Sequence, residues 1–312
     1  MIRRVLCRVV LFVVALAISV TVASEAYDLS SGRTVPAPPL DAHGHRVRTG
    51  DVVTHYERWG SKGTPVVLVH GFLESAQVWS RVGPVLAARG HRVYAIDVRG
   101  FGFTQRRGPY TLASDTDQLR GFVSALGLRH PLLVGHSSGA AVVGNLARLD
   151  PATVGGIVFM DGDGTPYGVG PGWIHGLFVD PFATTLIRLT NRHDGPARSI
   201  YASACGPGCP PFDPQVWLVP QRVAGAEDGL KAILSHQLIG MTSAQERTIR
   251  VPATVLYGVR DPQMSAAQAR ATAARLHTSE VHAIPHARHL GMLSAPADLA
   301  LLLDQAGRGS PT

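Results

Sequence analysis

Short runs of apolar residues alternate along most of the chain with segments whose apolar residues recur every three or four positions. The runs predict buried strands, and the recurring pattern predicts helices packed on a sheet. The predicted strands are 66–70, 92–97, 131–135, 156–160, 253–257 and 280–284, and the predicted helices are 76–88, 115–126, 138–149, 265–276 and 293–303. This order predicts an α/β fold with a mostly parallel, doubly wound sheet.

Two regions interrupt this alternation. Residues 45–59 alternate apolar and polar positions around Thr49-Gly50-Asp51, which predicts a hairpin. Residues 162–250 contain Gly- and Pro-rich stretches and helix-like patches but no clear strand pattern. We therefore predict a core formed by 45–161 and 251–306, with 162–250 as a mainly helical cap inserted into it.

The N-terminus is typical of a signal peptide over residues 1–26. Three arginines precede an uncharged, mostly aliphatic run at 9–23, and small residues follow it. We expect cleavage after Ser24 or Ala26 and export to the periplasm, the cell envelope or the medium. The alternative is an uncleaved membrane anchor, and no other membrane contact is expected. Residues 27–44 are rich in Ser, Pro and Gly and predict a linker.

The charge and cysteine content of the chain limit the kinds of partner and cofactor that we expect it to bind. The formal net charge of +7 comes from arginines that are scattered and form no basic run, so we expect no nucleic-acid partner. An exported domain would retain two cysteines, Cys205 and Cys209, and their spacing predicts a short disulfide loop. Two thiols do not complete a zinc site, and we expect neither a metal nor a cofactor. The oligomeric state is left open.

The clearest chemical signal is Gly135-His136-Ser137-Ser138-Gly139, a Gly-x-Ser-x-Gly motif. An apolar strand runs directly into it and a helix rich in small residues runs directly out. A nucleophile elbow requires this arrangement, because the turn is tight and larger side chains at its flanks would collide with strand and helix. The motif predicts Ser137 as a nucleophile lifted above the carboxyl edge of the sheet.

A serine nucleophile needs a base, and the base needs an orienting acid. Asp261 follows the predicted strand 253–257, and two histidines, His286 and His289, follow the strand 280–284. Asp161, which follows the strand 156–160, is the alternative acid. All of these positions lie after strand ends, where loops converge on one edge of a parallel sheet.

An oxyanion also needs backbone N–H donors. One is expected from Ser138, the residue after the nucleophile. The second is expected from Phe72, because the loop after strand 66–70 contains Gly71, which lets the backbone approach closely.

These blocks resemble the α/β-hydrolase superfamily, in its usual order, over nearly all of residues 45–305. The resemblance implies a catalytic triad of Ser137, Asp261 and His289, with Phe72 and Ser138 as oxyanion donors. Arg288 departs from the family pattern, in which many relatives carry Gly before the catalytic His, so His286 stays an alternative to His289. The blocks that carry the resemblance are His70-Gly71-Phe72, Asp97-Val98-Arg99-Gly100-Phe101-Gly102, Gly135-His136-Ser137-Ser138-Gly139, Gly258-Val259-Arg260-Asp261 and Ala287-Arg288-His289.

The resemblance implies a carboxylesterase-like enzyme that cleaves a small or medium apolar ester through an acyl-enzyme. Relatives that open epoxides or displace halide carry Asp in place of the nucleophilic Ser, and Ser137 argues against both activities. A carbon–carbon bond hydrolase, a perhydrolase, an aminopeptidase and a non-catalytic ligand-binding protein remain alternatives. Several apolar cap residues line the pocket or form the core of the cap itself: Trp173, Phe178, Phe182, Leu186 and Trp217.

Overall fold

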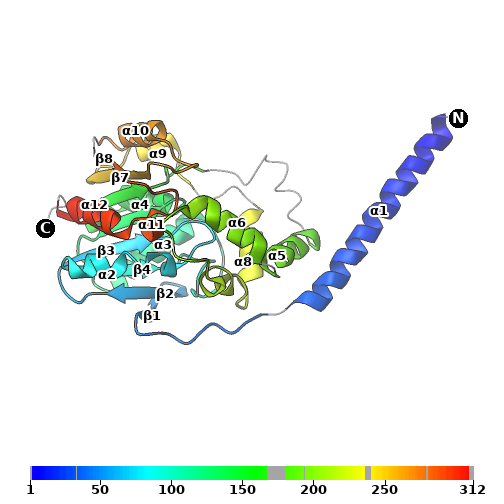
Figure 1. The fold of residues 1–312 in the computed structure, drawn as a ribbon, viewed down its shortest axis with the longest axis horizontal. Coiled ribbons are helices and arrows are strands. Elements are labelled where there is room, and N and C mark those ends of the chain that lie inside the picture. Colours follow the sequence, from blue (N-terminus) through cyan, green and yellow to red (C-terminus); the bar gives the residue numbers. More distant parts are fainter. Residues whose placement is uncertain are drawn as a thin grey trace.

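The computed structural model describes residues 2–32, 34–166, 180–192, 194–235, 240–278 and 280–308. At its centre, eight strands form one sheet in the order β1-β2-β4-β3-β5-β6-β7-β8 (Figure 1). The strands are β1 (Gly44–Thr49), β2 (Val52–Trp59), β3 (Thr64–Val69), β4 (His91–Ile96), β5 (Leu132–His136), β6 (Gly156–Met160), β7 (Ala253–Gly258) and β8 (Val281–Ile284).

The pairing confirms the predicted fold class. β1 and β2 form the expected antiparallel hairpin, and β2 also pairs antiparallel with β4. All other neighbours are parallel. The carboxyl ends of β5, β6 and β7 therefore lie side by side, since Gly135 pairs with Phe159 and Phe159 pairs with Val255. Each predicted catalytic side chain follows one of the strands at this edge or its neighbour.

Helices cover both faces of the sheet. On one face, α3 (Leu112–Ala125) and α4 (Gly139–Leu149) share an apolar core with α10 (Ala266–Arg275). On the other, α2 (Gly83–Ala88) and α12 (Pro296–Arg308) pack with residues of β3, β4 and β5. The inner strands β3, β5 and β6 are buried on both sides, which explains why they are continuous apolar runs.

Two predicted helices are each divided in the structure, and proline accounts for both divisions. The segment 76–88 is a 3₁₀ turn, η1 (Ala76–Trp79), followed by α2, and Pro84 lies in the first turn of α2. The segment 293–303 divides into α11 (Gly291–Ser294) and α12, because Pro296 starts α12 and disfavours helical backbone at Ala295.

The described part of the insertion between β6 and β7 is helical, as predicted. It contains α5 (Phe182–Arg192), α6 (Asp194–Cys205), α7 (Pro214–Trp217), η4 (Val219–Gln221), α8 (Ala226–Leu234) and α9 (Ser243–Glu246). Helices α5, α6 and α8 gather at one end of the sheet, whereas α9 packs against α4 (Figure 1).

The cap side chains named from the sequence have different environments. Trp173 and Phe178 lie outside the described residues. Phe182 and Leu186 are exposed, and Trp217 packs against Tyr201 with ring centroids 5.3 Å apart. Among the described residues, the linings of the two cavities beside the predicted nucleophile include none of these three.

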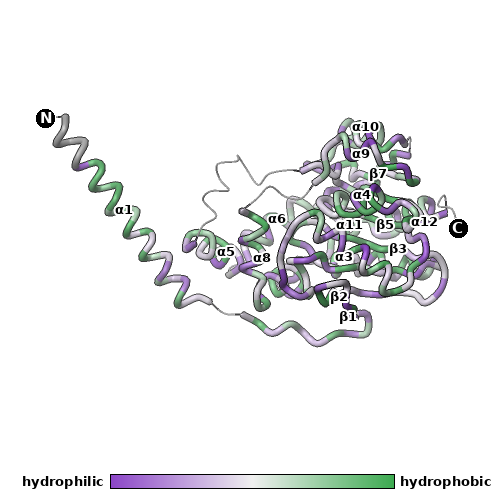
Figure 2. Tube along the Cα trace, turned by 180° about the vertical axis from the view of Figure 1, so that it is seen from behind, coloured by the Kyte–Doolittle hydropathy of each residue, from purple (hydrophilic) through white to green (hydrophobic). Residues whose placement is uncertain are grey.

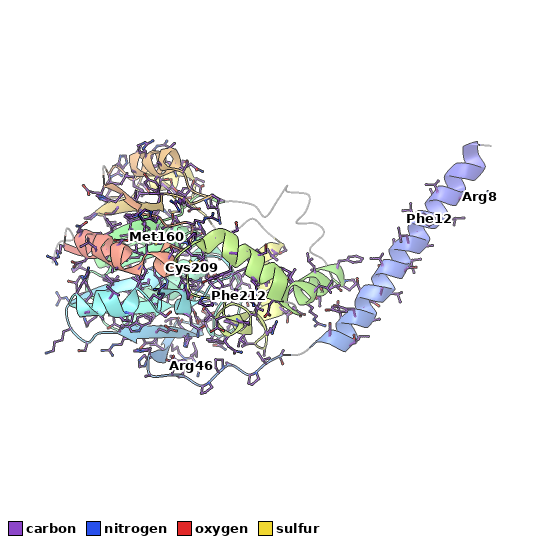
Figure 3. All side chains as sticks on the ribbon, in the orientation of Figure 1. Arg8, Phe12, Arg46, Met160, Cys209 and Phe212 are labelled. Carbon is purple, nitrogen blue, oxygen red and sulfur yellow. A yellow bond between two sulfur atoms is a disulfide. The ribbon has the colours of Figure 1, made fainter. Side chains whose placement is uncertain are left out.

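The predicted disulfide between Cys205 and Cys209 is present at the C-terminal end of α6, with a Cα–Cα distance of 5.9 Å. Figure 3 shows Cys209 between α6 and the sheet domain. The last turn of α6, which carries Cys205, contacts the segment after β8, because the Leu290 N–H donates to the Ala204 carbonyl (3.1 Å).

A long N-terminal helix, α1 (Ile2–Ser31), projects away from the sheet domain (Figures 1 and 2). Its segment Arg8–Ser31 contains an 18-residue stretch with a mean hydropathy of 2.3 and is long enough to cross a membrane. Side chains such as Phe12 extend from it into open space (Figure 3). The start of the predicted linker is helical, because no Gly or Pro interrupts the helix before Gly32. This apolar helix is compatible with a signal peptide or an anchor.

Candidate active site

Ser137 occupies the sharp turn between β5 and α4. Its φ is +50°, a left-handed value that is uncommon for a residue with a side chain. The Ser137 N–H donates to the Met160 carbonyl (2.9 Å), and the Ser137 carbonyl accepts from the Ala140 N–H (3.1 Å). The strained turn is therefore fixed by β6 on one side and by the start of α4 on the other.

The two glycines of the motif are required by space. A Cβ at Gly135 would lie 2.4 Å from the Gly139 carbonyl oxygen. A Cβ at Gly139 would lie 2.6 Å from the Val69 carbonyl oxygen. These collisions with backbone are the ones that the sequence predicts for a nucleophile elbow.

His289 and Asp261 form a buried hydrogen-bonded pair at the same edge of the sheet. His289 Nδ1 lies 2.9 Å from Asp261 Oδ2, and the Gln263 N–H donates to Asp261 Oδ1 (2.7 Å). Burial acts to raise the pKa of Asp261, but the hydrogen bond and charge of His289 prevail and hold that pKa below its usual value. His286, by contrast, is exposed, so the geometry brings His289 and not His286 to the acid.

Asp161 lies beside this pair without a hydrogen bond to His289 in the described part of the chain. Asp161 Oδ1 accepts the Gly258 N–H (2.6 Å), and its backbone has a left-handed φ of +49°. Burial, reinforced by the charge of Asp261, raises the pKa of Asp161 well above its usual value. Through its bond to the Gly258 N–H, Asp161 braces the turn on which Asp261 stands.

The loop after β3 passes directly over the nucleophile. A Cβ at Gly71 would lie 2.9 Å from the Ser137 Cβ, so only glycine allows this approach. Among the described residues, neither the Phe72 N–H nor the Ser138 N–H donates to a backbone carbonyl. Phe72 and Ser138, the residues predicted to supply the oxyanion donors, line the same small cavity.

A buried pair, Glu74 and His136, joins the three parts of the site. Glu74 Oε2 accepts the Gly71 N–H (2.8 Å) and lies 3.0 Å from His136 Nδ1, while His136 Nε2 lies 2.9 Å from the His289 carbonyl oxygen. The rings of His136 and His289 are 4.7 Å apart. Burial opposes ionisation of both, but mutual attraction lowers the pKa of Glu74 and raises the pKa of His136.

No pattern in the sequence singled out Glu74. Its position three residues after Gly71 is the one signal that could have suggested it, since a carboxylate there can accept the N–H of the glycine.

Two cavities lie beside the elbow, and Ser138 lines both. The larger, of about 240 Å³, is also lined by Ser137, Asp161 and Gln263. The smaller, of about 30 Å³, is lined by the oxyanion loop and by Asp115. Among the described residues, no group of three or more His, Cys, Asp or Glu side chains is arranged to hold a metal.

Comparison with known proteins supports this fold. A family model described as the alpha/beta hydrolase fold matches residues 64–208. The chain belongs to the α/β-hydrolase superfamily. Among solved structures, this α/β hydrolase is similar to a serine hydrolase involved in carbazole degradation (TM-score 0.65, 24% identity, 84% of this chain and 97% of that one). It is also similar to a putative aryl esterase from Burkholderia cenocepacia (TM-score 0.66, 22% identity, 85% and 98%). These likenesses establish the fold.

Among curated proteins, this α/β hydrolase is similar to epoxide hydrolase B of Mycobacterium tuberculosis, with 36% identity over 100 residues. The match covers 31% of this chain and 28% of that protein. Less than a third of the relative is therefore matched, and its activity is no guide to the reaction unless the site residues agree.

Proposed function

We propose that this α/β hydrolase cleaves carboxylic esters of small or medium apolar groups through an acyl-enzyme. The observation that carries this proposal is the His289–Asp261 pair, joined at 2.9 Å, beside the strained Ser137 elbow. Ser137 is the nucleophile, His289 is the general base, and Asp261 orients the imidazole.

The hydrogen bond to Asp261 leaves Nε2 of His289 to exchange protons in the site. His289 Nε2 takes the Ser137 hydroxyl proton as the serine oxygen bonds to the ester carbonyl carbon. The N–H groups of Phe72 and Ser138 stabilise the oxyanion that forms. His289 then gives the proton to the departing alcohol, leaving Ser137 acylated. Water, deprotonated by His289, releases the acid and restores the serine.

The nucleophile favours ester cleavage over epoxide opening. An epoxide opened by an aspartate gives an ester, which water can hydrolyse. An epoxide opened by Ser137 would give an alkyl ether, which His289 and water cannot cleave, so the enzyme would be trapped after one turnover. The partial similarity to epoxide hydrolases is therefore best assigned to the shared scaffold.

We further propose that the chain is exported with α1 serving as the signal. The apolar helix and the Cys205–Cys209 disulfide support this, because such bonds persist in oxidising compartments. Intact-mass analysis of native material tests it. A mature chain that begins near Glu25 or Tyr27 and lacks two thiol protons is expected, and a full-length, fully reduced protein would contradict it.

Two neighbouring serines provide the test of the catalytic proposal. Ser137→Ala removes the nucleophile, whereas Ser138→Ala keeps the backbone N–H that the mechanism uses. We expect Ser137→Ala to lose at least about a thousandfold in kcat on phenyl esters, and Ser138→Ala to stay within about tenfold of the native enzyme. Both should melt close to the native temperature. Ester hydrolysis by Ser137→Ala within tenfold of the native rate would refute the assignment.

A further inference from the structure

The smaller cavity beside the oxyanion loop contains a group that the mechanism does not use. Its wall includes Phe72 and Ser138, whose N–H groups are the oxyanion donors, and its other side includes Asp115 at the start of α3. Apolar side chains complete the lining, among them Phe101, Tyr110, Val142 and Ile233. A buried polar group normally has a hydrogen-bond partner, and one that lacks a partner requires an explanation.

Asp115 has no such partner in the described part of the chain. Its side chain is buried, and its Oδ1 makes no hydrogen bond. Arg99 also lines the cavity, and its buried Nε likewise makes no hydrogen bond to a described residue. Its other two nitrogens bond the carboxylate of Asp51 (2.6 and 3.2 Å) and the Arg107 carbonyl (2.9 Å). Two buried polar groups therefore line one cavity, and each lacks a hydrogen-bond partner at the atom named.

The protonation of Asp115 defines what the cavity can bind. Burial raises the pKa of Asp115 to about 8, although the charge of Arg99 opposes this. At neutral pH the carboxyl is thus mainly the neutral acid, which has an O–H to donate. Arg99 Nε–H is also a donor. Two donors suit an uncharged oxygen that accepts hydrogen bonds, and the apolar remainder of the lining suits a carbon chain.

We propose that this cavity is an acyl subsite, in which Asp115 and Arg99 bind a hydroxyl or carbonyl oxygen on the acyl chain of the substrate. The inference rests on the proposed ester hydrolysis and narrows its substrate class from plain apolar acids to acids with one such oxygen. The cavity of about 30 Å³ has room for one small polar group.

The direction of proton transfer assigns the cavity to the acyl side. The leaving alcohol must depart toward His289, which supplies its proton. Neither His289 nor Asp261 lines the small cavity, whereas Asp161 and Gln263, neighbours of the acid, line the larger one. The larger cavity therefore suits the alcohol, and the small one suits the acyl chain.

The test compares phenyl butyrate with phenyl 3-hydroxybutyrate and phenyl 4-oxopentanoate on the native enzyme and three variants. Asp115→Asn keeps a neutral hydrogen-bonding group, and Asp115→Leu removes it. Asp117→Leu, on the exposed side of the same helix, is the matched control.

The native enzyme should favour at least one oxygen-bearing ester over butyrate by tenfold or more in kcat/KM, as expected for a hydrogen bond made in a buried site. Asp115→Leu should abolish this preference and raise butyrate hydrolysis, while Asp115→Asn and Asp117→Leu should retain most of the preference.

The outcomes separate the two proposals. Butyrate hydrolysis that depends on Ser137, without any preference for the oxygen-bearing esters in the native enzyme, refutes the subsite and leaves ester hydrolysis standing. An equal preference in the native enzyme and in Asp115→Leu refutes it as well. Failure to hydrolyse any of the three esters counts against both proposals.

Discussion

Replacing Asp115 with asparagine should stabilise the protein, and by more at higher pH. A buried carboxyl that stays protonated in the folded state loses its proton on unfolding above its ordinary pKa. The folded pKa of about 8 lies above the usual value of 3.8, so the folded state binds more protons between these limits. The contribution of Asp115 to stability is therefore complete below about pH 4 and falls as the pH rises toward 8.

The size of the effect follows from that difference in pKa. Each unit corresponds to about 1.4 kcal/mol, so a separation of roughly four units lowers the free energy of unfolding by on the order of 5 kcal/mol between the two limits. Asparagine has nearly the same shape and no proton to lose. The difference in unfolding free energy between Asp115→Asn and the native protein should hence grow by about 1.4 kcal/mol per pH unit.

Equilibrium urea denaturation of both proteins between about pH 5 and pH 7.5 measures this growth. Subtracting the free energy of unfolding of the native protein at each pH removes the contributions of the titratable groups that both proteins share. Asp117→Asn, an exposed change on the same helix, should show a difference that does not vary with pH. A difference for Asp115→Asn that stays constant across this range would show that the carboxyl is ionised in the folded state, and the donor role assigned to it would be lost.

Three further predictions concern the acid of the triad, the oxyanion loop and the disulfide. Asp261→Asn should lower kcat by on the order of 10⁴ with little change in KM, because Asp261 is the partner of His289 Nδ1. Asp161→Asn should cost less than about tenfold, because Asp161 bonds the Gly258 N–H instead of His289. The reverse order in steady-state kinetics would assign the acid to β6. Glu74→Gln should lower kcat by about tenfold to a hundredfold through misplacement of the oxyanion loop, with KM nearly unchanged, and unaltered kcat would contradict this. Reduction of Cys205–Cys209 should lower the melting temperature, measured by circular dichroism, and an unchanged value would show that the loop adds no stability.

Local patterns made most of the fold predictable. The inner strands of the sheet, such as β3, β5 and β6, are continuous apolar runs because both faces are covered, and this pattern can be recognised in the sequence alone. The elbow was equally accessible, since its motif and the strand and helix that flank it are continuous in the sequence. The clash that requires Gly135 is local, with Gly139, whereas the clash that requires Gly139 is with the Val69 carbonyl of the neighbouring strand. Proline shifted helix boundaries instead of removing helices: Pro296 starts α12 where the sequence pattern alone suggested a continuous helix.

Features that depend on contacts between distant segments were not accessible from the sequence. Glu74 and His136 are 62 positions apart, and only the folded chain shows that they form one buried pair. Asp115 belongs to no recognisable sequence motif. It is buried beside the oxyanion loop because α3 packs on α4, and this contact is visible only in the folded chain. The choice between His286 and His289 likewise required the turn after β8 to be placed against Asp261.

Covalent labelling tests the central claim most directly. A fluorophosphonate forms a stable bond with a serine only when that serine is activated by a base and its oxyanion is stabilised. Incubation of the native protein, followed by digestion and mass spectrometry, should place one adduct on Ser137, and His289→Ala should slow labelling strongly. Absence of any adduct on Ser137 in folded protein would contradict its role as the nucleophile.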